Sequence, residues 1–157
     1  MDFTLSQKER MLLEDQKGHE QVCIDKYSNY AGKTQDPQLK DIFNANGQVE
    51  QEHLNSINQL LSGKLPQTGQ QQNQAVNQAS GQASVNTQAG AANKADDEMC
   101  KDMLMTEKYV SGAYDTSIFE FQNTNVRDVL NHIQKEEQKH GEAISQYMVS
   151  KGMYQPK

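Results

Sequence analysis

The sequence has no tryptophan, only three prolines and only two cysteines among its 157 residues. Cys23 and Cys100 form no C-x-x-C pair, which argues against a disulfide framework and against a cysteine-based metal site. Both lie at apolar helical positions, so we expect two small, buried hydrophobic side chains. A later oxidative cross-link between them stays open.

Long apolar runs are also absent. No stretch approaches the roughly 18 to 20 apolar residues of a membrane span, and the first ten residues contain no apolar run of the kind found in a signal peptide. We therefore expect no membrane partner, and synthesis in the cytosol.

Positive charge is in short supply, with 15 Lys and Arg against 21 Asp and Glu, a net charge of -6 and a pI near 5.2. Nucleic acids and anionic membranes are recognised through basic patches, so this balance disfavours both as partners. It suits a site that collects cations. The length fits a single domain that buries its core without disulfide or metal cross-links.

The middle of the chain has a different composition from its two ends. Between Gln67 and Lys94 it is rich in Gln, Asn, Ala, Ser, Thr and Gly, a mixture that buries too little apolar surface to offset its ordering entropy. We interpret residues 64–95 as a flexible crossover between two helical hairpins, 4–63 and 96–152. The sequence thus predicts an all-α, antiparallel four-helix bundle that forms one domain over 1–157.

Local signals mark the helix ends of the first hairpin. Ser6 and Glu9 form a potential capping box, and Gly32 supplies a stop for the helix that they open. The dipeptide Asp36-Pro37 combines an N-cap with proline at the first helical position. The second helix then ends near Gly63.

The second hairpin carries similar signals. The third helix is expected to be capped by Asp96 or Asp97 and to run through Phe121. The fourth helix is expected to be capped by Asn123 or Thr124 and to end at Gly152.

The two hairpins are copies at a constant offset of 87 residues, the distance from position 20 to position 107. No gap is needed anywhere along this alignment. The identical pairs include Glu20 with Glu107, Tyr27 with Tyr114, Glu50 with Glu137, His53 with His140, and Ile57 with Ile144.

Each copy contains one E-x-x-H motif, Glu50-Gln-Glu-His53 and Glu137-Gln-Lys-His140. This spacing places a carboxylate and an imidazole one turn apart on the same helical face. That face is the apolar one. In the second helix its members are Leu39, Ile42, Phe43, Val49, Leu54, Ile57 and Leu60.

The lone glutamates, Glu20 and Glu107, also lie among apolar neighbours. Glu20 and Glu50 are equidistant from Gln35 in the first turn, so antiparallel helices bring them level, and the second copy repeats this. Four buried carboxylates need compensating positive charge, which two divalent metal ions would supply. A metal-free buried polar network is the alternative.

Other ionisable residues receive a simpler interpretation. His132 and Glu136 are four residues apart and predict an exposed helical pair. His19 is expected at the surface.

A lone Glu from each of two helices and E-x-x-H from each of the other two resemble the ligand set of ferritin-like di-iron and di-manganese carboxylate proteins. The resemblance implies two divalent ions, iron or manganese. It also implies a role for each residue: Glu50 and Glu137 as bridging ligands, Glu20 and Glu107 as terminal carboxylates, His53 and His140 as ligands of one metal each, and Tyr27 and Tyr114 as hydrogen-bond donors near these ligands.

A closer resemblance is to the spore coat protein F family of endospore-forming bacteria, which is itself ferritin-like. It is clearest over 98–154 and rests on Met103-Leu-Met-Thr-Glu-Lys-Tyr, Asn131-His-Ile-Gln-Lys-Glu-Glu-Gln-Lys-His-Gly-Glu-Ala, and Tyr147-Met. It implies deposition on the forming spore from the mother-cell cytosol, with other coat proteins as partners. Two functions stay open, a structural or protective coat component and a di-iron or di-manganese oxidase, peroxidase or ferroxidase. Whether the chain forms a homo-oligomer also stays open.

Overall fold

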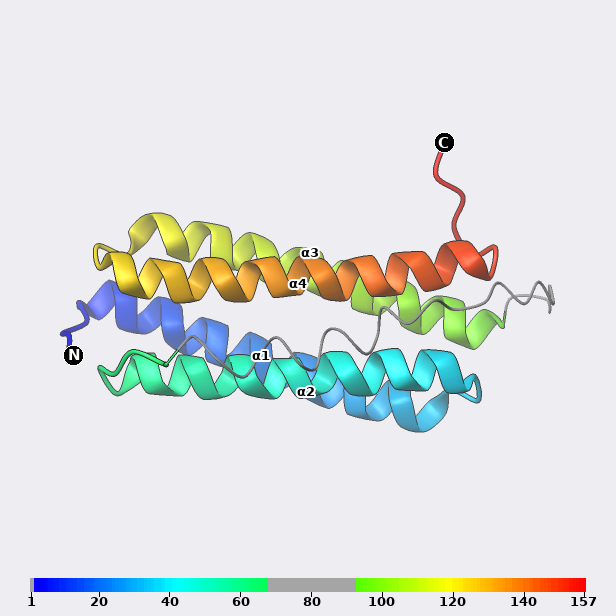
Figure 1. The fold of residues 1–157 in the computed structure, drawn as a ribbon, viewed down its shortest axis with the longest axis horizontal. Coiled ribbons are helices and arrows are strands. Elements are labelled where there is room, and N and C mark those ends of the chain that lie inside the picture. The colour runs from blue at the N-terminus through cyan, green and yellow to red at the C-terminus, as the bar shows by residue number, and fades with distance from the viewer. Residues whose placement is uncertain (1, 68–92) are drawn as a thin grey trace.

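The fold is known from a computed structural model that describes residues 2–67 and 93–157. Within these ranges four helices follow one another: α1 (Gln7–Lys33), α2 (Pro37–Leu61), α3 (Lys94–Glu120) and α4 (Thr124–Ser150). Helices α1 and α2 form one antiparallel hairpin and α3 and α4 form the other, and the two hairpins lie side by side (Figure 1). The all-α bundle of two hairpins is confirmed. Most of the predicted crossover, residues 68–92, lies outside the described residues.

The first helix begins as expected and ends later than expected. The Ser6 backbone N–H donates to Glu9 Oε2 at 2.8 Å and the Glu9 N–H donates to Ser6 Oγ at 3.2 Å, which confirms the capping box. The predicted stop at Gly32 is wrong, because α1 continues to Lys33 and leaves through Thr34 in an extended conformation. An extended exit does not need the left-handed conformation that favours glycine.

The second helix has the predicted ends. Asp36 accepts a hydrogen bond from the Gln38 N–H at 2.8 Å, and Pro37 is the first helical residue. Beyond Leu61 the chain turns through Gly63, whose φ is +76°. A Cβ at Gly63 would lie 2.9 Å from the Phe3 carbonyl oxygen, so this turn needs glycine both for its conformation and for its close contact with the N-terminal segment.

The third helix starts earlier than expected. Asn93 is its cap, with Oδ1 accepting from the Ala95 N–H at 2.9 Å, so the prediction of Asp96 or Asp97 as the cap is wrong. Asp96 instead lies in the first turn, where a negative charge interacts favourably with the helix dipole. Asn123 caps α4, as one of the two predicted residues.

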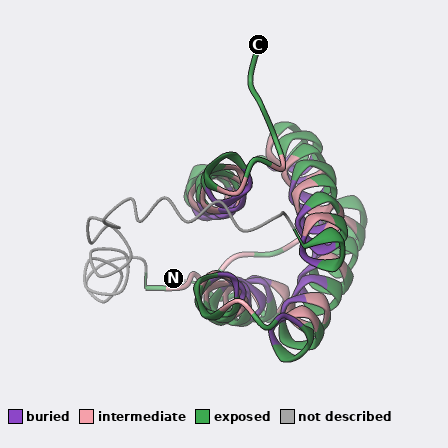
Figure 2. Cartoon of the chain, turned by 90° about the vertical axis from the view of Figure 1, so that its right-hand side faces the viewer, coloured by how far each residue is buried: buried purple, intermediate pink, exposed green. Residues whose placement is uncertain are grey.

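Apolar side chains fill the bundle at both ends. One cluster joins the start of α1 and the end of α2 to the α3–α4 turn, and includes Leu13, Leu60 and Leu130. The other lies at the opposite end and includes Phe43 and Met103. Viewed along the bundle, the buried residues line the inner sides of the helices (Figure 2).

The cysteines belong to different clusters, Cys23 to the first and Cys100 to the second, and both are buried and unbridged. Burial raises the pKa of both thiols, that of Cys100 to about 12, so both behave as the small hydrophobic side chains that we expected.

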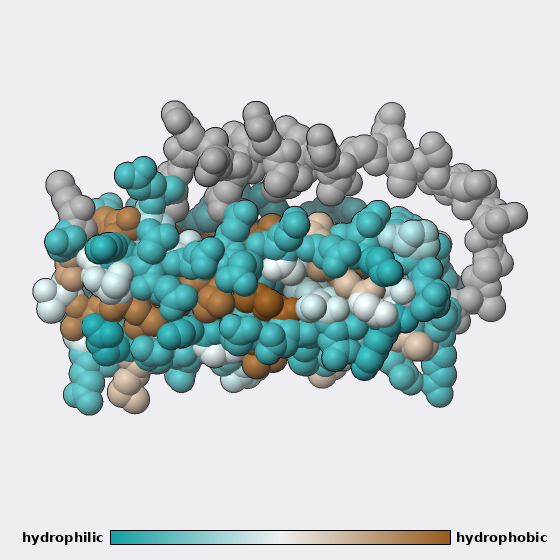
Figure 3. Space-filling view, turned by 90° about the horizontal axis from the view of Figure 1, so that it is seen from below, coloured by the Kyte–Doolittle hydropathy of each residue, from teal (hydrophilic) through white to brown (hydrophobic). Residues whose placement is uncertain are grey.

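The face that lies below in Figure 1 is mainly hydrophilic (Figure 3). Hydrophobic side chains gather at one end of this face and reach its middle, between hydrophilic ones (Figure 3). In the part of the chain that the structure describes, no helix combines the length and the apolar character needed to cross a bilayer.

Candidate metal centre

The structure brings all six predicted ligands together between the two apolar clusters. They form two groups of four, in which one potential ligand atom from each residue lies within 4.8 Å of the others. Two carboxylates are common to both groups, and all four helices contribute. The groups are Glu20, Glu50, His53 and Glu137, and Glu50, Glu107, Glu137 and His140.

The six side chains are almost completely buried, with 0% to 4% of their surface exposed. His53 Nδ1 lies 3.1 Å from Glu50 Oε2 and 3.2 Å from Glu137 Oε1. His140 Nδ1 lies 3.2 Å from Glu50 Oε1 and 3.4 Å from Glu107 Oε1. The two imidazole rings stack with their centroids 5.8 Å apart. Each histidine thus turns Nδ1 toward the shared carboxylates.

This cluster leaves many buried polar atoms without a hydrogen bond. Among the described residues these atoms include Glu20 Oε2, Glu50 Oε1, Glu107 Oε2, both Glu137 oxygens and both ring nitrogens of His140. Buried polar atoms without partners are rare in folded proteins and costly. Carboxylate oxygens and imidazole nitrogens are also the atoms that iron and manganese bind. The residues present therefore fit two divalent cations.

Crowding of buried carboxylates also changes their pKa values. Burial raises the pKa of Glu20, and burial with the neighbouring Glu137 raises the pKa of Glu107 to about 7. Burial acts on Glu50 too, but His140 and His53, whose Nδ1 atoms lie 3.2 Å and 3.1 Å from its oxygens, favour its charged form more strongly and hold the pKa of this carboxyl below its usual range. The metal-free cluster therefore retains protons that bound cations would displace.

Two tyrosines connect the hairpins at this level. Tyr27 Oη on α1 donates to Glu107 Oε1 on α3, and Tyr114 Oη on α3 donates to Glu20 Oε1 on α1. This reciprocal pairing relates the two hairpins by an approximate two-fold axis. Both hydroxyls are buried, and each holds one of the lone glutamates in place.

One neighbour of Tyr27 was not anticipated from the sequence. Asn46 Nδ2 donates to Tyr27 Oη at 3.1 Å, and Asn46 is only 6% exposed. Its position on the apolar face of α2, three residues after Phe43 and four before Glu50, is the signal that would have identified it.

His132 and Glu136 do pair as predicted, but the expectation that this pair is exposed is wrong for Glu136. Glu136 is 5% exposed, and its Oε2 lies 2.8 Å from His53 Nε2 on the neighbouring α2. Its Oε1 lies 3.4 Å from His132 Nε2, while His132 remains partly exposed. The duplication contained the missing signal, because Glu136 corresponds to Val49, a member of the apolar face.

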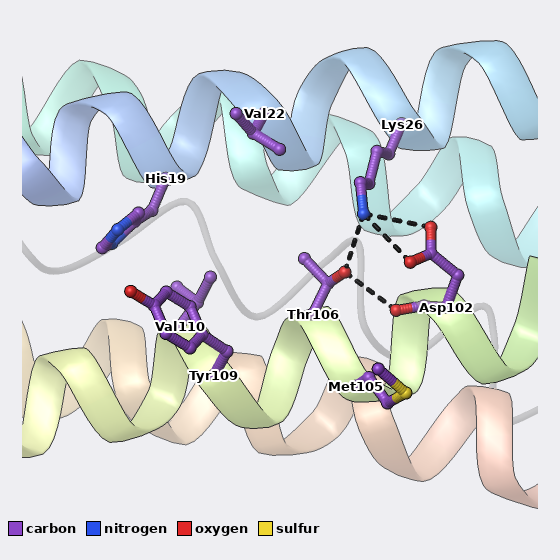
Figure 4. Close-up of a pocket in the computed structure, with 8 residues that line it drawn as sticks. All are labelled: His19, Val22, Lys26, Asp102, Met105, Thr106, Tyr109 and Val110. Carbon is purple, nitrogen blue, oxygen red and sulfur yellow. Dashed lines mark hydrogen bonds and ion pairs between the residues drawn. The ribbon is translucent and has the colours of Figure 1, made fainter.

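A separate groove lies on the outer side of the bundle between α1 and α3, lined by residues that include Val22, Met105 and Tyr109 (Figure 4). Lys26 crosses it, with Nζ 3.1 Å and 3.0 Å from the two carboxylate oxygens of Asp102. None of the six clustered ligands lines this groove.

Comparison with known protein families finds a match for the second hairpin. Residues 95–157 match the family model described as the Coat F domain, which spans nearly all of α3 and the whole of α4. Neither the curated proteins nor the solved structures contain a match to the chain. The second hairpin, with Glu107, Glu137 and His140, is therefore similar to the Coat F domain, and the expected resemblance to the spore coat protein F family is confirmed over residues 95–157.

Proposed function

We propose that this chain is a spore coat F-like protein whose ferritin-like bundle binds two divalent metal ions, iron or manganese. In this proposal it serves as a structural or protective component of the spore coat. The observation that carries the metal site is the set of buried, unpartnered carboxylate and imidazole atoms at one level of the bundle. The match of the second hairpin to the Coat F domain supports the coat role.

Each ligand takes the role that its position favours. Glu50 and Glu137 belong to both groups, so they would be the ligands that both ions share. The other four residues belong to one group each: Glu20 and His53 to the first, and Glu107 and His140 to the second. Tyr27 and Tyr114 hold the two terminal carboxylates by hydrogen bonds.

A structural role follows from where the ligands come from. Every helix contributes at least one ligand, so bound cations connect the two hairpins directly. Bound cations would also replace the protons that the metal-free cluster retains. Because α1 packs on α3 and α2 on α4, we also propose that residues 1–157 form one domain, with the crossover over 64–95.

A di-iron or di-manganese oxidase, peroxidase or ferroxidase is the second candidate function. Each group offers four protein residues, whereas manganese in oxygen-rich sites prefers six-coordinate, octahedral geometry. If each carboxylate gave one oxygen to each ion, coordination positions would remain for oxygen or peroxide.

Metal content and activity on the same sample test these proposals. We expect about two metal ions per chain after expression with iron or manganese, and almost none in the double variant Glu50→Ala with Glu137→Ala, since both carboxylates belong to both groups. The absence of iron, manganese and zinc from the folded, metal-supplemented protein would reject the site. Ferrous iron is then added, followed by oxygen or peroxide. Rapid oxidation supports the enzyme, and metal binding without turnover supports the structural role.

The coat assignment has its own test. Antibodies against the chain should label the coat layer of purified spores, and coat proteins should co-purify with it after cross-linking. Labelling confined to the spore core would contradict a coat role and leave the metal site unaffected.

A further inference from the structure

The two halves of the site differ in what lies behind each histidine. His53 Nε2, the nitrogen that faces away from the shared carboxylates, lies 2.8 Å from Glu136 Oε2. His140 Nε2 is equally buried and has no hydrogen-bond partner among the described residues. The residue that corresponds to Glu136 in the first hairpin is Val49, which has no side-chain acceptor.

A carboxylate behind a metal-binding histidine has a known physical effect. It accepts the N–H of the nitrogen that does not bind the metal, which fixes the tautomer and the orientation of the ring and raises the basicity of the ligating nitrogen. His53 has this arrangement: Nε2 is directed to Glu136, and Nδ1 is directed to Glu50 and Glu137. His140 presents Nδ1 in the same way without support behind it.

Glu136 has a second histidine neighbour. Its second oxygen, Oε1, lies 3.4 Å from His132 Nε2 on the same helix. Only 5% of Glu136 is exposed, so its charge is poorly screened by water and acts on the nearby His53. Both the orientation of His53 and the added negative charge favour a cation on the His53 side.

Resting on the metal site proposed above, we propose that the two metal positions are unequal, and that Glu136 is the positioning residue that makes the His53 position the tighter one. The first ion binds with Glu20, Glu50, His53 and Glu137, and the second completes the site at His140. The chain thus passes through a state with a single ion on one side.

The test is a titration of the metal-free protein with Co²⁺, followed by absorption and calorimetry. The unmodified chain should bind two ions in two resolved steps. Glu136→Gln, which keeps the size and removes the charge, should weaken the first step by about 10 to 100 times and weaken the second step clearly less. The matched control is Glu142→Gln, an exposed glutamate on the same helix, which should change neither step. Equal weakening of both steps by Glu136→Gln would overturn the proposal.

A second measurement uses the unmodified protein and does not depend on how a variant folds. With one equivalent of Zn²⁺, the imidazole nitrogen NMR signals of His53 should become those of a metal-bound ring, while those of His140 stay in the range of an unbound ring. Metal-bound signals from both histidines in equal amounts would overturn the proposal, because they indicate two equal positions. A folded chain that takes up neither Co²⁺ nor Zn²⁺ would instead reject the metal site itself, so the two failures are distinguishable.

Discussion

Stripping the metal ions from the loaded protein is expected to lower its thermal stability strongly, because the six ligands belong to all four helices. A ligand that binds only the folded state stabilises it by RT ln(1 + [L]/Kd), about 2.7 kcal/mol when free ligand exceeds Kd 100-fold. Two sites together contribute about 5.4 kcal/mol. At roughly 2 to 4 °C per kcal/mol for a chain of this size, the melting temperature should fall by roughly 10 to 20 °C.

Differential scanning calorimetry of stripped and Mn²⁺-reloaded samples measures this shift. The control is Glu50→Ala with Glu137→Ala, which removes both shared carboxylates and should melt at the same temperature with and without Mn²⁺. A chain that demonstrably holds two ions, yet melts within about 2 °C of its stripped form, would refute the idea that the metal connects the two hairpins.

Two further predictions concern residues outside the ligand set. Gly47→Ala should lower the free energy of unfolding, because the new Cβ would lie 3.3 Å from Cβ of the fully buried Tyr27. Gly112→Ala is the control: no atom lies within 4 Å of its Cβ, so it should stabilise the fold by up to about 1 kcal/mol. Chemical denaturation measures both free energies. Burial alone would raise the pKa of Asp36, but hydrogen bonds, first that from Tyr147, outweigh it and hold this pKa below its usual value. The contact therefore stabilises the fold fully above the unfolded pKa of about 3.9 and is lost as the pH falls through the lower folded pKa, so Asp36→Asn should flatten the acid side of the stability profile.

The arrangement of the six clustered residues could be predicted because it depends on regular features. Helical periodicity places Glu50 and His53 on one face, and the constant offset repeats that face in the second hairpin. The equal distances of Glu20 and Glu50 from their turn bring both to the same height in any antiparallel hairpin. No knowledge of detailed packing is required for these steps.

The helix ends were harder to predict, because several residues compete for each one within about 1 kcal/mol. Asn93 and Asp96 are both good caps, and Gly32 is compatible with a helix as well as with a stop. Glu136 escaped prediction for another reason. Because it is charged, we expected its side chain to face solvent. It is buried instead by its contact with His53 on the neighbouring helix, which sequence spacing within α4 does not reveal.

The differences between the two hairpins lie immediately around the ligands, which are themselves identical. Asn46 in the first hairpin corresponds to Ile133 in the second, and Val49 corresponds to Glu136. As a result the amide of Asn46 donates to Tyr27, and the carboxylate of Glu136 contacts His53. Tyr114 and His140 have no such neighbours at the corresponding positions. A duplicated site that only neutralised buried charge would require no such differences. Exchanging positions 49 and 136, as Val49→Glu with Glu136→Val, should therefore reverse the order in which the two histidines bind Zn²⁺, and an unchanged order would show that these surroundings do not control metal affinity.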